Sequence, residues 1–308
     1  MDVKALLMGL AFALMWSSAF TSARMIVVDA PPLAALFLRF LLSGLLGVGI
    51  ALALGQHWRG LDRRQWRGIL IFGLCQNALY LGLNFVAMQR IEASLAAIIA
   101  SSMPLLVALA NWRIFRERLP LLGVAGLVAG FVGVAFIMGE RLSGGADPVG
   151  IAMCLIAALA LAFATLAVRG ASSGGNILMI VGLQMLVGSA VLLPVSLAIE
   201  TWTFTPTPRL FWAFAYTTVV PGLAATWVWF KLVGRIGATR SATFHFLNPF
   251  FGVLVAAAFL SEALNLTDLI GVVIIMAGIL AVQLCRVSGA PSAAGQGAAV
   301  KDAAARGR

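Results

Sequence analysis

The chain alternates between long apolar runs and short polar connections. A helix needs about 20 apolar residues to cross a bilayer, whereas the strands of a membrane barrel alternate apolar and polar residues. The runs here are continuous and of helical length, so the pattern predicts an all-α integral membrane protein. Ten runs are expected to be transmembrane helices, numbered spans 1 to 10, at roughly 4–23, 33–54, 68–88, 94–113, 121–139, 149–169, 176–199, 209–231, 239–260 and 267–286.

Composition and charge agree with a membrane location. The chain is 62% hydrophobic and 10% charged, against about 25% charged residues in soluble domains. Its net charge of +10 needs no nucleic-acid partner, because loop Lys and Arg residues gather on the side of the N-terminus, which is typical of the cytoplasmic face. We therefore predict cytoplasmic termini and a multi-pass protein of the bacterial inner membrane. The opposite side carries Arg24, Arg90, Arg141 and Arg209.

The two ends of the chain and its cysteines carry little chemistry. Span 1 has no A-x-A cleavage site at the end of its apolar run, so we expect it to be retained rather than removed as a signal peptide. Residues 287–308 are rich in Ala, Gly and Ser and predict a disordered cytoplasmic tail. Cys75, Cys154 and Cys285 lie scattered within spans, which favours neither a disulfide framework nor a metal site. We expect no cofactor.

The two halves of the chain repeat one pattern. "IEASLAAIIASSMPLL" aligns with "IGATRSATFHFLNPFF", and the same offset pairs further residues along the chain. Each unit holds five spans, an odd number, so the second copy enters the membrane inverted, as in many secondary transporters. We predict two inverted five-helix repeats, residues 1–144 and 145–286. The paired residues include Pro104 with Pro249, Glu117 with Glu262, Gly126 with Gly271, Gly133 with Gly278, and Arg39 with Gln184.

Each half ends in a proline-bearing span, an acidic turn and a glycine-rich span. The segments "FRERLPLLGVAGLVAGFVGVAFI" and "LSEALNLTDLIGVVIIMAGILAV" resemble the drug/metabolite transporter superfamily in its ten-helix EamA-type members. "ALMWSSAF" and "ATFHFLNPFFG" are similar to segments of bacterial amino-acid exporters, including the YddG-type exporters of aromatic amino acids. The resemblance implies a central cavity built by spans 1, 3, 4, 6, 8 and 9, with spans 5 and 10 as scaffold.

Span 9 carries polar residues where lipid would penalise them. On an ideal helix Ser241, His245, Asn248 and Gly252 share one face, which we predict to border a solute cavity; hydrogen bonding between helices is the alternative. Pro249 has no N–H, so we expect the carbonyl of His245 to lose its helical partner and the span to bend. Pro104 predicts a second such hinge.

Other spans supply further candidate substrate-binding residues. Span 3 places three amides and a phenol on one face, and mid-membrane aromatic residues add apolar contacts; packing is the alternative for each. Arg39 is expected to be structural, snorkelling to the outer surface or pairing with a carbonyl or an acid such as Asp29. Trp229 is expected to face lipid or the membrane interface. The candidates, besides His245 and Asn248, are Trp16, Gln76, Asn77, Tyr80, Asn84, Ser101, Phe163, Trp227 and Phe244.

Absent motifs narrow the function. The sequence has no P-loop, no H-E-x-x-H and no paired carboxylates, so we expect no enzyme. No Asp or Glu lies within a span, which disfavours cationic drugs; the small four-helix relatives use a glutamate where this chain has "ALMWSSAF". The prediction is an exporter of neutral or zwitterionic metabolites, above all amino acids including aromatic ones, by alternating access. Alternatives are an exporter of other amphipathic metabolites or drugs, and a non-transporting scaffold or lipid-handling component.

Partners and energy source complete the expectations. We expect a small-molecule substrate and membrane lipid as partners, no nucleic acid, and a monomer with an oligomer left open. His245 is the one side chain within a span whose ordinary pKa, about 6.5, lies near working pH. Either His245 carries a proton in an antiport cycle or the solute runs down its own gradient, and we favour the second.

Overall fold

The computed structural model describes residues 3–116, 119–167 and 175–288. Over these residues every regular element is helical, and ten helices are long and apolar enough to span a membrane, which confirms the prediction of ten helices. The predicted tail from residue 289 onward and Glu117 lie outside the described residues. Six spans are continuous helices: α1 (Val3–Asp29), α2 (Pro32–Ala53), α7 (Leu121–Ser143), α8 (Pro148–Ala167), α9 (Ile177–Ile199) and α14 (Leu266–Ser288).

The other four spans are interrupted near mid-membrane. Spans 3 and 8 each contain a π-helical segment, and spans 4 and 9 break just before Pro104 and Pro249. Span 3 comprises α3 (Arg63–Phe72), η2 (Gly73–Tyr80) and α4 (Leu81–Ala87), after the short helix η1 (Trp58–Gly60); span 4 comprises α5 (Ala93–Ala100) and α6 (Met103–Arg113). Span 8 comprises α10 (Pro208–Thr217), η3 (Thr218–Ala224) and α11 (Ala225–Ile236); span 9 comprises α12 (Ala238–Ala242), η4 (Thr243–Leu247) and α13 (Asn248–Leu260).

These interruptions fall at equivalent places in the two halves. The π-helical segments start at Gly73 and Thr218, which the repeat alignment pairs, as it pairs the two prolines. A proline removes a backbone donor and collides with the preceding turn, and π-helical turns are frequent at functional sites. The broken spans therefore collect non-ideal backbone in the middle of the bundle, as in transporters built from repeats.

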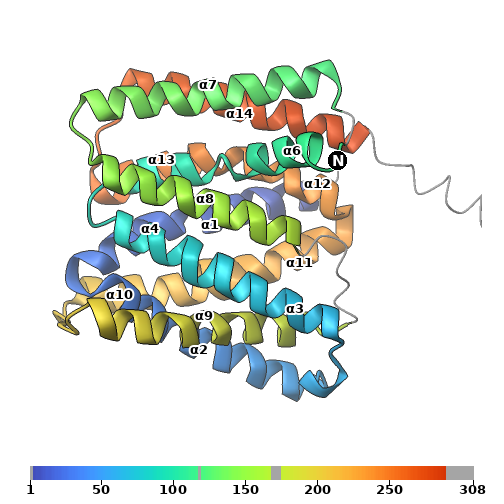
Figure 1. The fold of residues 1–308 in the computed structure, drawn as a ribbon, viewed down its shortest axis with the longest axis vertical. Coiled ribbons are helices and arrows are strands. Elements are labelled where there is room, and N and C mark those ends of the chain that lie inside the picture. Colours follow the sequence, from blue (N-terminus) through green and yellow to red (C-terminus); the bar gives the residue numbers. More distant parts are fainter. Residues whose placement is uncertain (1–2, 117–118, 168–174, 289–308) are drawn as a thin grey trace, which may run out of the picture.

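Glycine contacts show how the repeats pair. A Cβ atom added to Gly126 of α7 would lie 2.8 Å from the carbonyl of Gly278 in α14, and one added to Gly133 would lie 3.2 Å from the carbonyl of Gly271. The contacts are reciprocal between equivalent residues, so the two helices cross antiparallel about a pseudo-two-fold axis. Small residues permit this close approach. α2 and α9 pair likewise, and these two helix pairs lie at opposite ends of the bundle (Figure 1).

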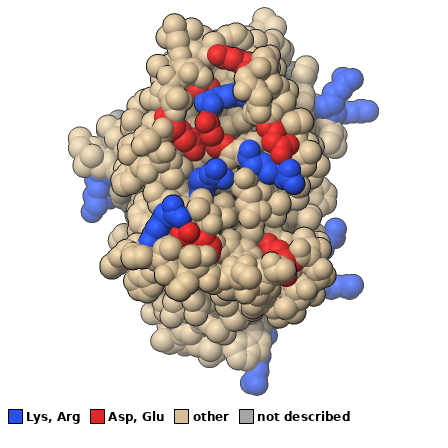
Figure 2. Space-filling view, turned by 90° about the vertical axis from the view of Figure 1, so that its left-hand side faces the viewer, with Lys and Arg blue, Asp and Glu red and all other residues tan. Residues whose placement is uncertain are grey.

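Charged side chains close the face opposite the N-terminus, called here the far face. Glu200 accepts hydrogen bonds from the backbone N–H groups of Leu33 and Ala34, and Glu262 from those of Ala93 and Ser94. Each carboxylate thus neutralises the positive end of a helix that starts there. Figure 2 shows basic and acidic residues interspersed on this face.

Three arginine clusters tie different spans together on the far face. Arg141 pairs with Glu92 and Asp268 at 2.6 Å each, Arg209 with Asp29 at 2.6 Å, and Arg90 with Asp147 at 2.8 Å. The Arg90 guanidinium holds the pKa of the Asp147 carboxyl below its usual range. Three of the arginines expected on this side therefore serve as cross-links between spans.

Candidate functional site

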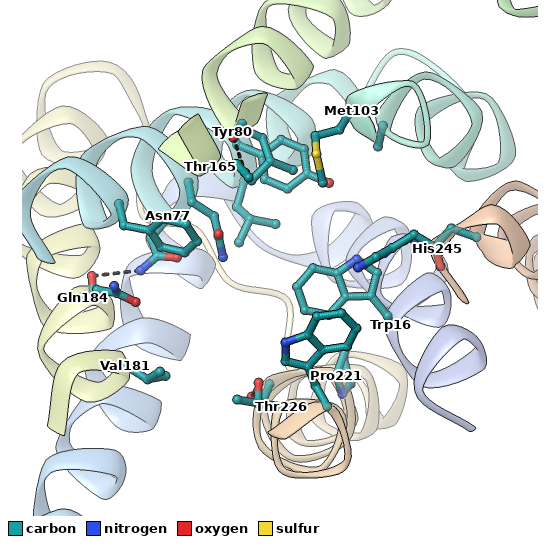
Figure 3. A pocket seen from close by; sticks show the side chains of 18 of the residues that line it. Trp16, Asn77, Tyr80, Met103, Thr165, Val181, Gln184, Pro221, Thr226 and His245 are labelled. Atoms are coloured by element: carbon teal, nitrogen blue, oxygen red, sulfur yellow. Dashed lines mark hydrogen bonds between the residues drawn. The ribbon is translucent and has the colours of Figure 1, made fainter. Parts of the chain in front are cut away.

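A cavity of about 660 Å³ lies between the broken spans. Its wall is formed by four continuous helices, α1 (span 1), α2 (span 2), α8 (span 6) and α9 (span 7), together with the four broken spans 3, 4, 8 and 9 (Figure 3). The implied wall of spans 1, 3, 4, 6, 8 and 9 is therefore present, with spans 2 and 7 added, and spans 5 and 10 stay outside it. This volume lies within the range of small-molecule sites, about 300–1,000 Å³.

The lining residues show that the cavity reaches the side of the bundle that holds the N-terminus and does not reach the far face. Ile177 in the first turn of α9, Thr165 near the end of α8, and Val233 near the end of α11 line it, and all three helix ends lie on the side of the N-terminus. Towards the far face the last lining residues are mid-helix ones such as Phe20 and Arg39. The cavity therefore extends from the membrane interior to the N-terminal side.

The structure brings most of the predicted polar residues together. Gln76, Asn77 and Tyr80 from the π-helical segment η2 line the same cavity as Trp16 from α1. The Nδ2 of Asn77 donates to the backbone carbonyl of Gln184 at 2.8 Å, across the two halves (Figure 3). The other predicted residues in the lining are Ser101, Pro104, His245 and Asn248.

Two predicted binding residues are buried outside the cavity. Asn84 is 1% exposed; its Nδ2 donates to the carbonyl of Tyr80 at 2.7 Å and its Oδ1 accepts from the Cys154 thiol at 3.3 Å, so its amide holds helices together. Phe244 packs with Ala5 against Gly9 of α1, because the 3₁₀ turn of η4 rotates it off the cavity wall.

Two further aromatic candidates point outward. Phe163 is 59% exposed and Trp227 62% exposed, which in a membrane-spanning segment means contact with lipid. The ring of Trp227 lies under the Lys231 ammonium, 5.6 Å from its centroid. Pro249 is buried just outside the lining, while span 9 does break ahead of it. We remove Asn84, Phe163, Trp227 and Phe244 from the candidate site, and the hinge role of Pro104 and Pro249 stays a prediction.

An aromatic cluster forms one wall of the cavity. The rings of Phe12 and Trp229 lie 4.7 Å apart between centroids, and the His245 ring lies 5.3 Å from each. Trp16 packs beside them, 5.7 Å from Phe12 (Figure 3). The expectation that Trp229 faces lipid or the interface is corrected, because the π-helical η3 ahead of it shifts the register of the span and leaves Trp227 outside.

His245 and Asn248 form a hydrogen-bonded pair on this wall. Asn248 Nδ2 lies 3.0 Å from His245 Nδ1. An amide nitrogen only donates, so this contact assigns the acceptor lone pair to Nδ1 and the imidazole proton to Nε2. The Oδ1 of Asn248 is buried and has no hydrogen-bond partner. The pair therefore leaves one buried acceptor of the Asn248 side chain without a protein partner.

The remaining expectations for span 9 are corrected by its 3₁₀ segment. The backbone N–H of Asn248 bonds to the carbonyl of His245, which is therefore not left without a partner. Ser241 bonds to the carbonyl of Gly237, and Gly252 packs against Ala97. The four-residue polar stripe required an ideal helix, and the 3₁₀ turns leave only His245 and Asn248 on the cavity.

Arg39 also lines the cavity, contrary to the structural role expected for it. It is 7% exposed, so it does not snorkel to the surface. Asp29 does not pair with it either, because both Asp29 oxygens bind Arg209 and one also accepts from Thr207. Sequence reasoning missed Arg39 as a lining residue, although its alignment with Gln184, which also lines the cavity, was a usable signal.

The chemistry of the lining suits binding more than catalysis. Among its described residues none is Asp or Glu, and no group of three metal-ligating side chains occurs in the described parts of the chain. Aromatic faces, amides and hydroxyls offer stacking and hydrogen bonds to a solute. Thr165 and Thr226 add hydroxyls that no pattern in the sequence singled out.

Known proteins match this chain along most of its length. It is 29% identical to an uncharacterized transporter of Bacillus subtilis (strain 168), YvbV, over 86% of this chain and 87% of the relative, and 24% identical to Protein PecM of Dickeya dadantii (strain 3937), over 86% of each. A solved crystal structure matches with a TM-score of 0.66 and 21% identity, covering 94% of this chain and 100% of its own, a likeness of fold. The sequence profile of the EamA-like transporter family matches twice, at residues 3–139 and 148–284. The chain belongs to the EamA-like transporter family.

Proposed function

We propose that this transporter carries small neutral or zwitterionic metabolites, above all amino acids including aromatic ones. The observation that supports this most is the mid-membrane cavity, which combines aromatic faces with amide groups and has no carboxylate among its described lining residues. A cationic drug would lack a counter-charge there. A large amino-acid side chain would stack on the rings of Trp16 and Trp229, while the amides bind its polar end.

We further propose export from the cytoplasm by alternating access. With the N-terminus in the cytoplasm of a bacterium, the cavity opens inward and the far face, held by its arginine clusters, faces outward. This conformation would receive solute from the cell. The paired breaks in spans 3, 4, 8 and 9 would supply the bending that opens the far face.

The proposed export runs down the solute gradient without a proton. Coupled pumps usually carry a titratable group within the membrane. His245 is packed against Phe12, Trp16 and Trp229, and its Nδ1 accepts from Asn248, an arrangement that suits the neutral ring. An exporter of surplus metabolite needs no pump, because the cell interior is the concentrated side.

A counterflow screen tests the proposed function. Purified protein in liposomes is loaded with each of the twenty amino acids, and uptake of the same radiolabelled amino acid is measured. We expect counterflow of aromatic and other large amino acids. Ser101→Trp, which fills the cavity, should abolish it, whereas Phe163→Trp on the lipid-facing side of α8 should not. Counterflow of none of the twenty would refute the proposal and favour another solute or a non-transporting role.

A further inference from the structure

The strongest unexplained feature of the cavity is a buried cation. Arg39 lies seven residues into α2, about 10 Å along the helix from its outer end. Its side chain is 7% exposed and lines the cavity. Arginine stays protonated in proteins, so the wall carries a full positive charge within the membrane.

This charge has no described counter-ion. Among the described residues, no Asp or Glu forms an ion pair with Arg39, and its Nε has no hydrogen-bond partner. The guanidinium carbon lies 5.4 Å from the centroid of the neighbouring Phe40 ring. A buried charge without a partner is costly, and such residues in membrane proteins mark functional sites.

The surroundings of Arg39 differ from those of its equivalent in the other repeat, Gln184. The repeat alignment pairs Arg39 with Gln184 and Asn77 with Gly222. In one half, the Asn77 amide bonds across to the backbone of Gln184 at 2.8 Å. In the other half, the position facing Arg39 is a glycine, where an added Cβ would lie 3.7 Å from the Nη2 of Arg39. An added Cβ at this distance would be in van der Waals contact with the guanidinium, and the glycine places no side chain against that donor.

We propose that Arg39 binds the carboxylate of the solute, so that the substrates of this protein are carboxylate-bearing, with zwitterionic amino acids favoured over neutral metabolites. The proposal rests on the proposed function of the same cavity and narrows its substrate class. A guanidinium binds a carboxylate through two parallel hydrogen bonds. One bound carboxylate would neutralise the single charge of the wall and supply the partner that Arg39 lacks.

A second pair of groups in the lining suits the other end of a zwitterion. The Oδ1 of Asn248 and the hydroxyl of Ser17 are buried without partners. Both accept hydrogen bonds, which an ammonium group donates. The aromatic faces of Trp16 and Trp229 also attract a cation. The lining thus offers one partner, Arg39, to the carboxylate of a solute, and several partners to its ammonium group.

The test compares two probes that differ only in the carboxylate. L-phenylalanine and L-phenylalaninamide share the ring and the amine, and their dissociation constants are measured by the change in tryptophan fluorescence of purified protein. We expect phenylalanine to bind on the order of 10- to 100-fold more tightly than its amide, the range for a hydrogen bond to a charged group. Arg39→Gln, which copies the residue of the other repeat, should remove this preference.

A matched control and a second variant keep the test decisive. Arg24→Gln removes an arginine of α1 that bonds to the Met88 carbonyl away from the cavity, and should leave the preference unchanged. Arg39→Lys keeps the charge without the planar fork and should retain part of the preference. If Arg39→Gln does not fold, the two probes on wild-type protein and on Arg39→Lys still decide.

The outcomes separate this inference from the proposed function. Equal affinities of wild-type protein for the two probes, no binding of either, or an unchanged preference in folded Arg39→Gln would overturn the role of Arg39. Counterflow of amino acids alongside such a result would leave the proposed function standing. An Arg39-dependent preference without counterflow would support the carboxylate site and refute transport of amino acids.

Discussion

Replacing Asn248 with alanine isolates one polar group of the cavity wall. The side chain makes one hydrogen bond, Nδ2 to His245 Nδ1 at 3.0 Å, and its Oδ1 is buried without a partner. Losing the bond leaves His245 Nδ1 unpaired and costs roughly 1–3 kcal/mol, whereas removing the buried unsatisfied Oδ1 recovers a similar amount. The two effects oppose each other, so the variant should fold with a thermal midpoint close to that of wild-type protein.

Its effect on substrate should be much larger. If the Oδ1 accepts a hydrogen bond from the ammonium of a bound amino acid, deleting it removes about 1.5–3 kcal/mol of binding free energy, or roughly 10- to 100-fold in affinity. The assay is the concentration dependence of counterflow in liposomes, together with the thermal midpoint in detergent. A loss of apparent affinity at unchanged stability is the expected result.

Asn84→Ala is the matched control, because it removes the same amide from a non-cavity position. Both ends of Asn84 are bonded within the protein, to the Tyr80 carbonyl and the Cys154 thiol. The variant should lower the free energy of unfolding by about 0.6 kcal/mol for each lost bond, seen as a lower thermal midpoint, and leave apparent affinity unchanged. Unchanged affinity in Asn248→Ala, or equal affinity losses in both variants, would refute the reasoning.

Three further predictions concern packing, topology and energy. Gly278→Ala should destabilise the protein by about 1–3 kcal/mol, because its Cβ would lie 2.6 Å from a backbone carbonyl of α7. The control Gly139→Ala has open space around its Cβ and should not destabilise the protein. Equal thermal midpoints of the two variants would contradict this prediction. Reporter fusions at Gly145 and after α14 should report periplasm and cytoplasm, and one compartment for both would contradict the proposed orientation. A pH gradient alone should accumulate no amino acid in liposomes; uphill accumulation abolished by His245→Ala, with exchange preserved, would establish antiport instead.

Much of the fold follows from the sequence because lipid leaves few choices. Continuous apolar runs must be helices, and the ten spans lie within a few residues of their predicted positions except at the ends of the first, third and eighth. The paired glycines of spans 5 and 10 contact each other as an inverted repeat requires. Here composition and spacing carry the information, and no side-chain geometry is needed.

The site was predictable only in part, because local backbone departs from the ideal helix. A regular helical wheel puts Asn84 beside Tyr80, but the π-helical η2 turns only the first part of span 3 toward the cavity. In span 8 the π-helical η3 has the same effect: Trp229 lines the cavity, and Trp227 does not. Arg39 was misread for another reason: a charge within a span was expected to find a protein partner, and in this fold Asp29 is already bound to Arg209.

The most direct test of the account is to locate a bound substrate. A crystal structure with 4-bromo-L-phenylalanine would place the bromine by its anomalous scattering. We expect one bromine peak inside the cavity beside the rings of Trp16 and Trp229, with the carboxylate of the ligand at Arg39. A bromine peak elsewhere on the protein and none in the cavity would contradict the claim that this cavity is the substrate site.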